Sequence, residues 1–139
     1  MKKILHVILI SLFSLTIISC AKKSNTSSSS SSEGSAVTTL AGTGSIGSAN
    51  GTGTLASFSR PRGITRDGTN LYVADTYNHL IRKIVISTGV VTTLAGTGSS
   101  GSADNSTGTS ASFNGPRGIT TDGTNLYVAD QSNHLIRKI

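Results

Sequence analysis

The chain has 139 residues, of which 35% are hydrophobic and 4% aromatic, and its formal net charge is +6. This length is enough for one ordinary domain. A single Cys excludes a framework of internal disulfide bonds, so the folded part must be held by packing and by hydrogen bonds between strands.

The first 19 residues have the layout of a secretory signal. Lys2 and Lys3 precede an apolar run over residues 4–18, which is too short to span a bilayer comfortably. The run ends at Ile-Ile-Ser-Cys, which resembles the lipobox of bacterial lipoproteins. This resemblance implies a signal peptide over residues 1–19 and acyl chains such as palmitate on Cys20, the mature N-terminus. We therefore expect an exported protein, anchored by lipid to the bacterial cell membrane or the outer membrane.

Two other outcomes remain open at this site. Ser19, Cys20 and Ala21 also form a small-x-small pattern, and a signal peptidase that cleaves after Ala21 would release a soluble protein. An uncleaved segment would remain as a membrane anchor. Because export by any of these routes removes the chain from cytoplasmic RNA and DNA, we expect no nucleic-acid partner despite the basic charge.

Residues 20–36 are predicted to form a flexible tether between the signal and a folded domain over residues 37–139. Residues 22–35 are rich in Ser and contain no large apolar side chain. Such a segment cannot bury enough surface to offset the conformational entropy that folding would cost. The tether would hold the folded domain close to a membrane surface.

One stretch of the folded domain occurs twice in the sequence. Residues 37–84 return almost unchanged as residues 91–139, and the copies lie 54 residues apart at Val37 and 55 apart at Asn78. One residue inserted in a Gly/Ser/Asn-rich loop accounts for the difference. Periods of this size indicate a repeat architecture, in which one supersecondary unit cannot bury its apolar faces alone. The function must then be sought in the assembled array.

The repeat begins with a predicted strand and a long loop. Residues 37–41, and their copy at residues 90–95, are rich in Val, Thr and Leu and are followed by Gly, a pattern that favours a short strand. Residues 42–57 consist mostly of Gly, Ser, Thr, Ala and Asn, which predicts a loop that is long by the usual standard.

Three further strands are predicted after this loop. Pro61 opens the first of them, at a position that needs no ladder N–H, and the Asp-Gly pair at Asp67 favours a tight turn. Residues 71–74 return as a strand that is apolar on both faces, as expected between two other sheets. Residues 79–84 form the third strand, in which Arg82 and its neighbour Lys83 are charged. The unit is therefore four short antiparallel strands without a helix.

These submotifs resemble the NHL repeat. Phe58, Pro-Arg-Gly-Ile, Asp-Gly-Thr-Asn-Leu-Tyr-Val-Ala-Asp and Asn-His-Leu-Ile-Arg-Lys-Ile occur in this order twice, with repeat cores at residues 58–95 and 113–139. The resemblance implies an all-β fold of four-stranded antiparallel β-propeller blades. It places the Pro-Arg-Gly strand innermost, at the central channel, and the Val-Thr-Thr-Leu-Ala strand outermost. Propellers of this family usually have about six blades, so two repeats imply a partial propeller.

Three explanations for two blades remain open. The chain is a truncated or partial product of a longer propeller gene, or it is a two-blade monomer. Alternatively, three copies build a homotrimeric six-bladed ring, in which each N-terminal strand completes a blade of its neighbour. Each bare blade face measures roughly 300 Å², which is at the limit of what soluble monomers expose.

Structural roles in the repeat account for the titratable residues, without a catalytic or metal-binding role. His79 and His134 could be metal ligands, as in propeller lyases and lactonases, but they occupy one slot of the repeat signature, away from the channel. Asp75 and Asp67 with their copies are turn formers. No nucleophile with a base partner is found. We therefore expect no catalytic residue, no metal site, no cofactor and no enzyme activity.

Arg62 and Arg117 are the candidate ligand contacts. If the Pro-Arg-Gly strand is innermost, successive blades place a ring of Arg near one channel mouth, where an anionic ligand could dock. Surface exposure or ion pairing between blades is the alternative role. The copies differ in predicted turns, where a binding face would be tuned; the differing pairs are Arg60 and Gly115, Arg66 and Thr121, and Thr76-Tyr77 and Gln131-Ser132.

These observations predict a membrane-anchored bacterial NHL-repeat lipoprotein, which acts as a binding or scaffold propeller at the cell envelope. Its ligand would be a protein or a carbohydrate. The alternative is a fragment of a propeller enzyme of the lyase or lactonase type, whose metal site lies in missing blades.

Overall fold

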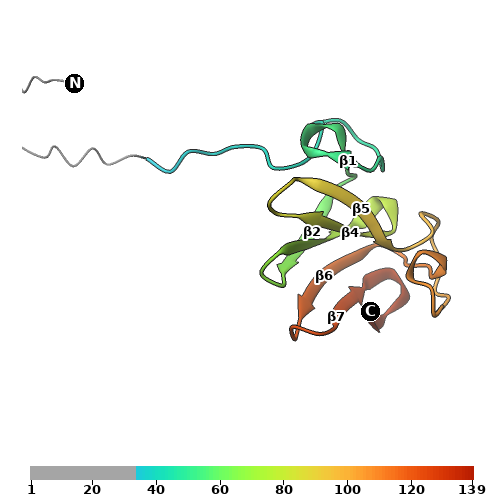
Figure 1. The fold of residues 1–139 in the computed structure, drawn as a ribbon. Helices are drawn as coiled ribbons and strands as arrows, with labels where there is room; N and C mark the ends of the chain where they lie inside the picture. The colour runs from blue at the N-terminus through green and yellow to red at the C-terminus, as the bar shows by residue number, and fades with distance from the viewer. Residues whose placement is uncertain (1–33) are drawn as a thin grey trace, which may run out of the picture. The chain divides into compact units, whose positions relative to one another are not determined.

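The computed structural model describes residues 34–139, which form two antiparallel sheets (Figure 1). The larger sheet has the strand order β1-β5-β4-β3-β2 and the smaller one β6-β7-β8. The strands are β1 (Gly51–Thr52), β2 (Pro61–Arg66), β3 (Asn70–Asp75), β4 (Leu80–Val85), β5 (Val90–Ala95), β6 (Pro116–Thr121), β7 (Leu126–Asp130) and β8 (Leu135–Lys138). The all-β prediction is confirmed.

Four short 3-10 turns complete the described part of the chain. They are η1 (Gly53–Leu55), η2 (Thr76–Asn78), η3 (Gly108–Ser110) and η4 (Gln131–Asn133). Within residues 34–139 we find no helix with the length and apolar character that a membrane crossing requires. The predicted signal over residues 1–19, the lipid site at Cys20 and most of the predicted tether lie outside the described residues.

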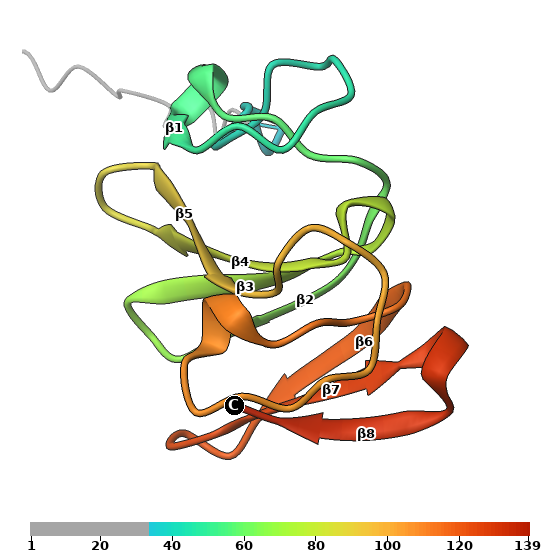
Figure 2. The same cartoon turned by 90° about the vertical axis from the view of Figure 1, so that its right-hand side faces the viewer.

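The two sheets are stacked as two blades (Figure 2). We call β2 to β5 blade 1 and β6 to β8 blade 2. The Pro-Arg-Gly strands β2 and β6 each form one edge of their sheet, and they are neighbours across the two blades. This is the relationship that the innermost strands of adjacent propeller blades have, as the repeat pattern predicts.

The main core lies between the blades. Ala74 and Ile81 of blade 1 are fully buried against Phe113 and Val128 of the second repeat, and Ala95 closes the cluster. Apolar surface on one blade is therefore removed from water by the next blade, which is how a repeat array is stabilised. The interface between the blades thus holds one of two hydrophobic clusters, and the other is formed by Ala56, Val73, Ile84 and Val91.

Two hydrogen bonds and one glycine hold the blades at a fixed spacing. Thr76 Oγ1 donates to the carbonyl oxygen of Pro116 at 2.7 Å, and the N–H of Gly115 donates to His79 Nδ1 at 3.1 Å. A Cβ atom on Gly63 would collide with the carbonyl oxygen of Arg117. Strands β2 and β6 can approach this closely only because residue 63 has no side chain.

The prediction of a strand at residues 37–41 is wrong, although the same sequence forms β5 in the second repeat. Strand β5 pairs with β4, with Thr92 opposite Lys83 and Val91 opposite Ile84. A strand needs such a ladder partner for its backbone groups. Residues 1–36 contain no copy of the third-strand motif that could pair with residues 37–41.

Two smaller differences concern the predicted loop and the third strand. The loop over residues 42–57 contains β1, which pairs with β5 and makes the larger sheet five-stranded. Strand β4 begins at Leu80 rather than at His79, because His79 ends the turn η2 with a left-handed backbone (φ 55°). The sequence repeat and the blade are also out of phase, since β5 closes blade 1 but belongs to the second repeat.

Candidate ligand-binding groove between the blades

The most conspicuous charged residues of the repeat form part of the scaffold. Arg82 Nη1 lies 2.9 Å from Asp75 Oδ2, and both side chains are fully buried. The same guanidinium donates to the carbonyl oxygens of Ser57 and Ala49, at 3.1 and 3.0 Å. The ring of Phe58 covers it, with Cζ 5.2 Å from the ring centroid. The ion pair thus ties the long loop to the blade.

The other hydrogen bonds that the carboxylate of Asp75 accepts explain why the repeat signature contains an Asn. Asn78 Nδ2 donates to Asp75 Oδ2 and to the carbonyl oxygen of Gly47, both at 2.7 Å. The N–H of Ser59 donates to Asp75 Oδ1 at 2.7 Å. Blade 2 repeats the bond between the Asn and Asp side chains, from Asn133 to Asp130 at 2.8 Å.

Sequence reasoning missed the burial of Arg82 and of its copy Arg137. Arg82 was identified only as a charged residue of the third strand. Neighbouring residues of a strand point to opposite faces, so one of Arg82 and Lys83 had to face the core. Asp75 could have indicated that Arg82 is buried, because a buried guanidinium requires a charged partner and the carboxylate of Asp75 can supply it.

Asp67 and Asp122 close the hairpin turns, as predicted. Asp67 accepts hydrogen bonds from Asn70 and from the hydroxyl of Tyr72, and these hold the pKa of its carboxyl well below the ordinary value. In the second repeat the hydrogen bonds from Asn125 are the main cause of the same shift in the pKa of Asp122. Both turns lie at the end of the blades away from η2 and η4, and they are structural.

A groove of about 230 Å³ opens where the turns η2 and η4 of the two blades meet the segment that leads into β6. Its lining residues are Thr76, Tyr77, His79, Asn114, Gly115, Arg117, Gln131 and Ser132. All of them except His79 and Arg117 occupy positions at which residues 58–84 and 113–139 differ. Two almost identical blades therefore vary mainly around one surface groove.

The chemistry of this groove suits binding. It presents amide and hydroxyl groups on Asn114, Gln131 and Ser132, an aromatic ring on Tyr77, and the exposed guanidinium of Arg117. Such convergent polar groups fix the orientation of a ligand. Among residues 34–139 no group of three His, Cys, Asp or Glu side chains is placed to hold a metal ion.

The two candidate arginines do not share this groove. Arg117 lines it, whereas Arg62 lines a separate cavity of about 440 Å³, next to residues 38–41 and Ile64. Arg60 stacks on Tyr77, with Cζ 4.5 Å from the ring centroid, and donates to its hydroxyl at 3.0 Å. The site predicted from the Arg pair is therefore divided between two blade faces.

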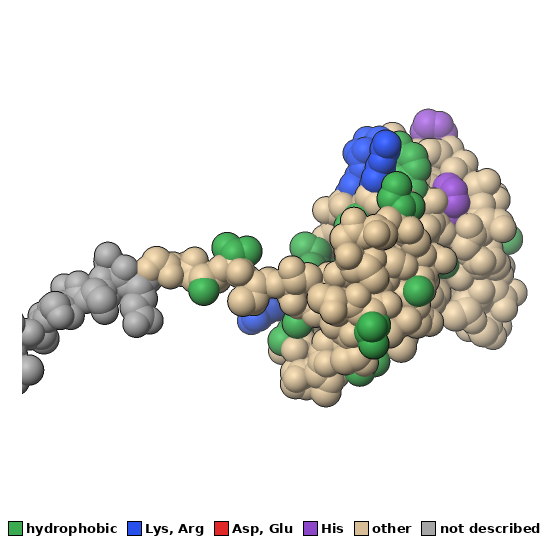
Figure 3. Space-filling model, turned by 90° about the horizontal axis from the view of Figure 1, so that it is seen from above, with side chains coloured by type: hydrophobic (Ala, Val, Ile, Leu, Met, Phe, Trp, Pro, Cys, Tyr) green, Lys and Arg blue, Asp and Glu red, His purple; other side chains and the backbone are tan. Residues whose placement is uncertain are grey.

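The groove also contains residues that sequence reasoning placed differently or missed. Asn114 differs from its counterpart Ser59, but this difference was not singled out. His79 lies at the groove and accepts a hydrogen bond from the next blade. One face of the molecule carries Lys and Arg side chains together with His side chains, and no acidic side chain is visible on it (Figure 3). A positive surface of this kind attracts anionic groups.

Comparison with known proteins connects this fold to one repeat family. The family model described as the NHL repeat matches residues 58–84. Human "NHL repeat-containing protein 2" is 43% identical over 96 residues, which cover 66% of this chain and 13% of the human protein. The Arabidopsis thaliana protein "SUPPRESSOR OF QUENCHING 1, chloroplastic" is 38% identical over 97 residues, which cover 68% of this chain and 9% of that protein. The chain thus spans a small part of these relatives.

Solved structures from Bacteroides share the fold. An auxiliary nutrient binding protein from Bacteroides ovatus superposes with a TM-score of 0.60 and 29% identity, over 68% of this chain and 26% of that chain. A protein from Bacteroides thetaiotaomicron for which a phosphatase activity has been suggested superposes with a TM-score of 0.63 and 26% identity, over 73% of this chain and 26% of that chain.

Proposed function

This chain belongs to the NHL-repeat β-propeller proteins, and on that premise we propose that it is a ligand-binding propeller protein of the bacterial cell envelope, held at the membrane by lipid on Cys20. The observation that carries the proposal is the groove between the blades. Of the five positions at which residues 58–84 and 113–139 differ, four contribute a residue to the groove. Variation concentrated at one surface is expected where recognition is tuned.

The groove chemistry favours an acidic carbohydrate. Hydroxyl and amide side chains suit the hydroxyl groups of a sugar, the ring of Tyr77 suits an apolar sugar face, and Arg117 suits a carboxylate. A volume of about 230 Å³ accommodates one sugar unit of a longer chain. The similarity to an auxiliary nutrient binding protein supports a nutrient as the ligand. A protein ligand is the competing possibility.

Calorimetric titration of the full-length protein in detergent tests this proposal. The probes are oligogalacturonate and an uncharged oligosaccharide of the same length. We expect Arg117→Ala to weaken binding of the acidic probe by about 10-fold to 150-fold, since a hydrogen bond to a charged group contributes about 1.5–3 kcal/mol. Arg66→Ala removes an equal charge outside the groove and serves as the control. Equal losses in both variants, or no binding of the acidic probe, would refute the groove as the site.

A second pair of variants uses the repeats as templates for each other. Replacing Tyr77 by Ser gives η2 the corresponding exposed residue of η4 and keeps the hydrogen bond from Thr76 to Pro116, and we expect it to alter the preference among sugar probes. Arg66→Thr makes the corresponding exchange at the differing position outside the groove. It should leave the preference unchanged.

The lipid anchor needs its own test, because Cys20 lies outside the described residues. The proposal rests on the Ile-Ile-Ser-Cys sequence that follows the apolar run. We expect labelled palmitate to be incorporated into the wild-type chain in a bacterial host and not into Cys20→Ala. Anchoring of Cys20→Ala in membranes as in the wild type would argue for an uncleaved segment instead.

The proposal assigns the chain no enzyme activity, and the names of the nutrient binding relatives support this assignment. The observation that favours an enzyme is the fold similarity to the suggested phosphatase. An assay distinguishes the binding protein from the enzyme. It measures hydrolysis of p-nitrophenyl phosphate by the full-length protein, with and without added divalent metal. Turnover that is lost in Arg117→Ala would replace the binding proposal by an enzymatic one.

A further inference from the structure

We propose that Arg60 is a positioning residue of the groove between the blades, because it holds the ring of Tyr77 at the place where a ligand stacks. The inference rests on the proposed function, since it adds a residue to the same binding site. Tyr77 lines the groove, whereas Arg60 is not among the lining residues. Arg60 therefore acts on the ligand through Tyr77.

The side chains of Arg60 and Tyr77 make two contacts with each other. The guanidinium of Arg60 lies over the ring of Tyr77, with Cζ 4.5 Å from the ring centroid. Its Nη1 also donates a hydrogen bond to the Tyr77 hydroxyl at 3.0 Å. The face of an aromatic ring attracts a cation, and the hydrogen bond fixes the direction in which the hydroxyl points. Together the two contacts hold the ring in one orientation.

The backbone of the turn does not fix this ring by itself. The N–H of Tyr77 donates to the carbonyl oxygen of Ser59 at 3.1 Å, and blade 2 has the same bond from Ser132 to Asn114 at 3.0 Å. These bonds anchor the main chain and leave the side-chain torsions free to change between rotamers. Tyr77 is 53% exposed, so its orientation depends on the contact with Arg60.

Arg60 has a backbone conformation that suits glycine. Its φ of 50° lies in the left-handed region, and Gly115 occupies the same slot of the second repeat with a φ of 63°. A Cβ atom is disfavoured in this region, whereas glycine enters it freely. The first repeat thus carries a strained residue where the second has an unstrained one. Strained residues of this kind cluster at functional sites.

The two positions differ together between the repeats. Blade 2 has Gly115 and Ser132 in the place of Arg60 and Tyr77. A Cβ atom on Gly115 would lie 3.1 Å from Ser132 Oγ, so this slot faces the same neighbour in both blades. The aromatic ring and the residue that holds it are therefore present as a pair in blade 1 and absent as a pair from blade 2.

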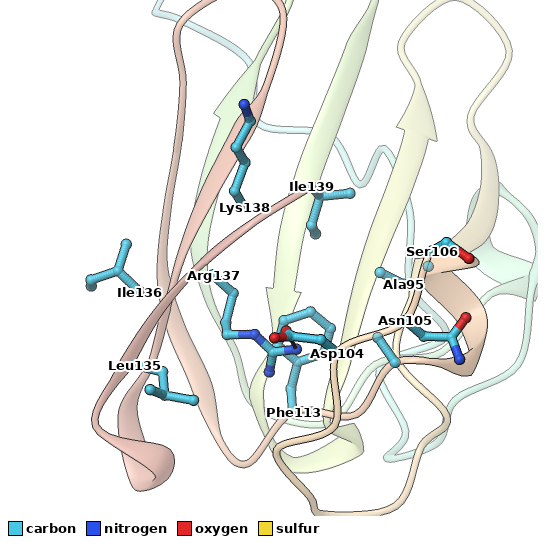
Figure 4. Close-up of a pocket in the computed structure, with 12 residues that line it drawn as sticks. Ala95, Asp104, Asn105, Ser106, Phe113, Leu135, Ile136, Arg137, Lys138 and Ile139 are labelled. Atoms are coloured by element: carbon cyan, nitrogen blue, oxygen red, sulfur yellow. Dashed lines mark hydrogen bonds and ion pairs between the residues drawn. The ribbon is translucent and has the colours of Figure 1, made fainter.

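Arg60 differs from two arginines that stack on aromatic rings in the scaffold. Arg82 lies over Phe58, and its copy Arg137 lies over Phe113 with Cζ 5.0 Å from the ring centroid (Figure 4). Both of these guanidinium groups are buried and paired with a carboxylate. Arg60 is exposed and forms no ion pair within residues 34–139. Its contact with an aromatic ring is therefore not one of the contacts that build the blade.

A ring that is held in place favours binding. Ordering a side chain when the ligand arrives costs free energy, and a side chain that is ordered beforehand avoids this cost. Tyr77 can then stack on the apolar face of a sugar while Arg117 meets the carboxylate of the same ligand. The two blades thus supply different contacts to one sugar unit.

A double-mutant cycle in calorimetric titration tests the inference, with the full-length protein in detergent and oligogalacturonate as the probe. Arg60→Gly introduces the residue of the second repeat, and Tyr77→Ser removes the ring. We expect Arg60→Gly to weaken binding by about three- to tenfold, which corresponds to the cost of ordering one side chain. In the Tyr77→Ser background Arg60→Gly should have no effect, because the ring is absent. Arg66→Thr, the charge-matched control, should leave the affinity unchanged.

An equal loss in both backgrounds would mean that the charge of Arg60 attracts the acidic probe directly, which would overturn the positioning role. Thermal unfolding provides the second readout. Arg60→Gly should keep the wild-type midpoint, because glycine occupies the same slot of blade 2. A lowered midpoint together with weaker binding would make Arg60 a structural residue and would also overturn the inference.

The outcomes distinguish this inference from the proposed function. Unchanged affinity of Arg60→Gly, while Arg117→Ala still weakens binding, would overturn the inference and leave the proposed function in place. No binding of oligogalacturonate by the wild type would overturn both.

Discussion

Arg82 and Asp75 form an ion pair from which water is excluded, with 2.9 Å between Nη1 and Oδ2 and no exposed side-chain surface on either residue. Removing one partner of such a pair leaves a buried charge uncompensated, which costs about 3–5 kcal/mol. We expect Arg82→Met to lower the free energy of unfolding by this amount in urea denaturation. Lys83→Met, at the half-buried neighbouring position, should change it by less than about 1 kcal/mol. Equal effects would mean that the pair does not hold the blade together.

Gly63 and Gly118 occupy the same slot in β2 and β6 but have different surroundings. A Cβ on Gly63 would collide with the backbone of Arg117, whereas a Cβ on Gly118 meets only the side chain of Ala129 at 3.5 Å. We expect Gly63→Ala to cost about 1–3 kcal/mol by overpacking. Gly118→Ala should be nearly neutral. Both are compared by thermal unfolding.

His79 and His134 should also differ in how much each contributes to the stability of the domain. His79→Ala removes the acceptor of the Gly115 N–H and should lower the free energy of unfolding by about 1 kcal/mol. His134 is exposed, so His134→Ala should be neutral in a single chain. A destabilised His134→Ala monomer would show that His134 has a partner within its own blade.

Acid should destabilise the domain through the hairpin turns. The pKa of Asp67 and of Asp122 is lowered in the folded state by hydrogen bonds to the carboxylate. Their contribution is therefore complete above the ordinary pKa of 3.8 and is lost as the pH falls through the lowered value. We expect the urea midpoint to fall below about pH 4. The double variant Asp67→Asn/Asp122→Asn should show a smaller decline, and an unaltered decline would assign it to other carboxylates.

The strand arrangement could be predicted because each strand carries its own submotif. The Pro at the start of β2, the Asp-Gly turn before β3 and the Asn-His-Leu sequence before β4 mark these elements in order. Residues 37–41 show where this reasoning stops. Their pattern is that of β5, but a strand exists only where a ladder partner is present, and the partner is a tertiary property.

The candidate site was predictable in part for a similar reason. The turns that contain Tyr77 and Gln131 were identified because the two repeats differ there. Their meeting in one groove depends on how blade 1 packs on blade 2, which neither repeat encodes alone. The same packing separates Arg62 from Arg117, since Arg117 lines the groove between the blades and Arg62 lines the cavity next to residues 38–41.

The offset between repeat and blade has a consequence for how such genes change in length. The second period encodes the outer strand β5 for the blade before it and the three strands β6 to β8 for its own blade. Recombination that inserts or deletes one whole period therefore adds or removes strands in matched numbers. Every interior blade stays complete after such an event, so the array can grow or shrink without a misfolded intermediate gene product.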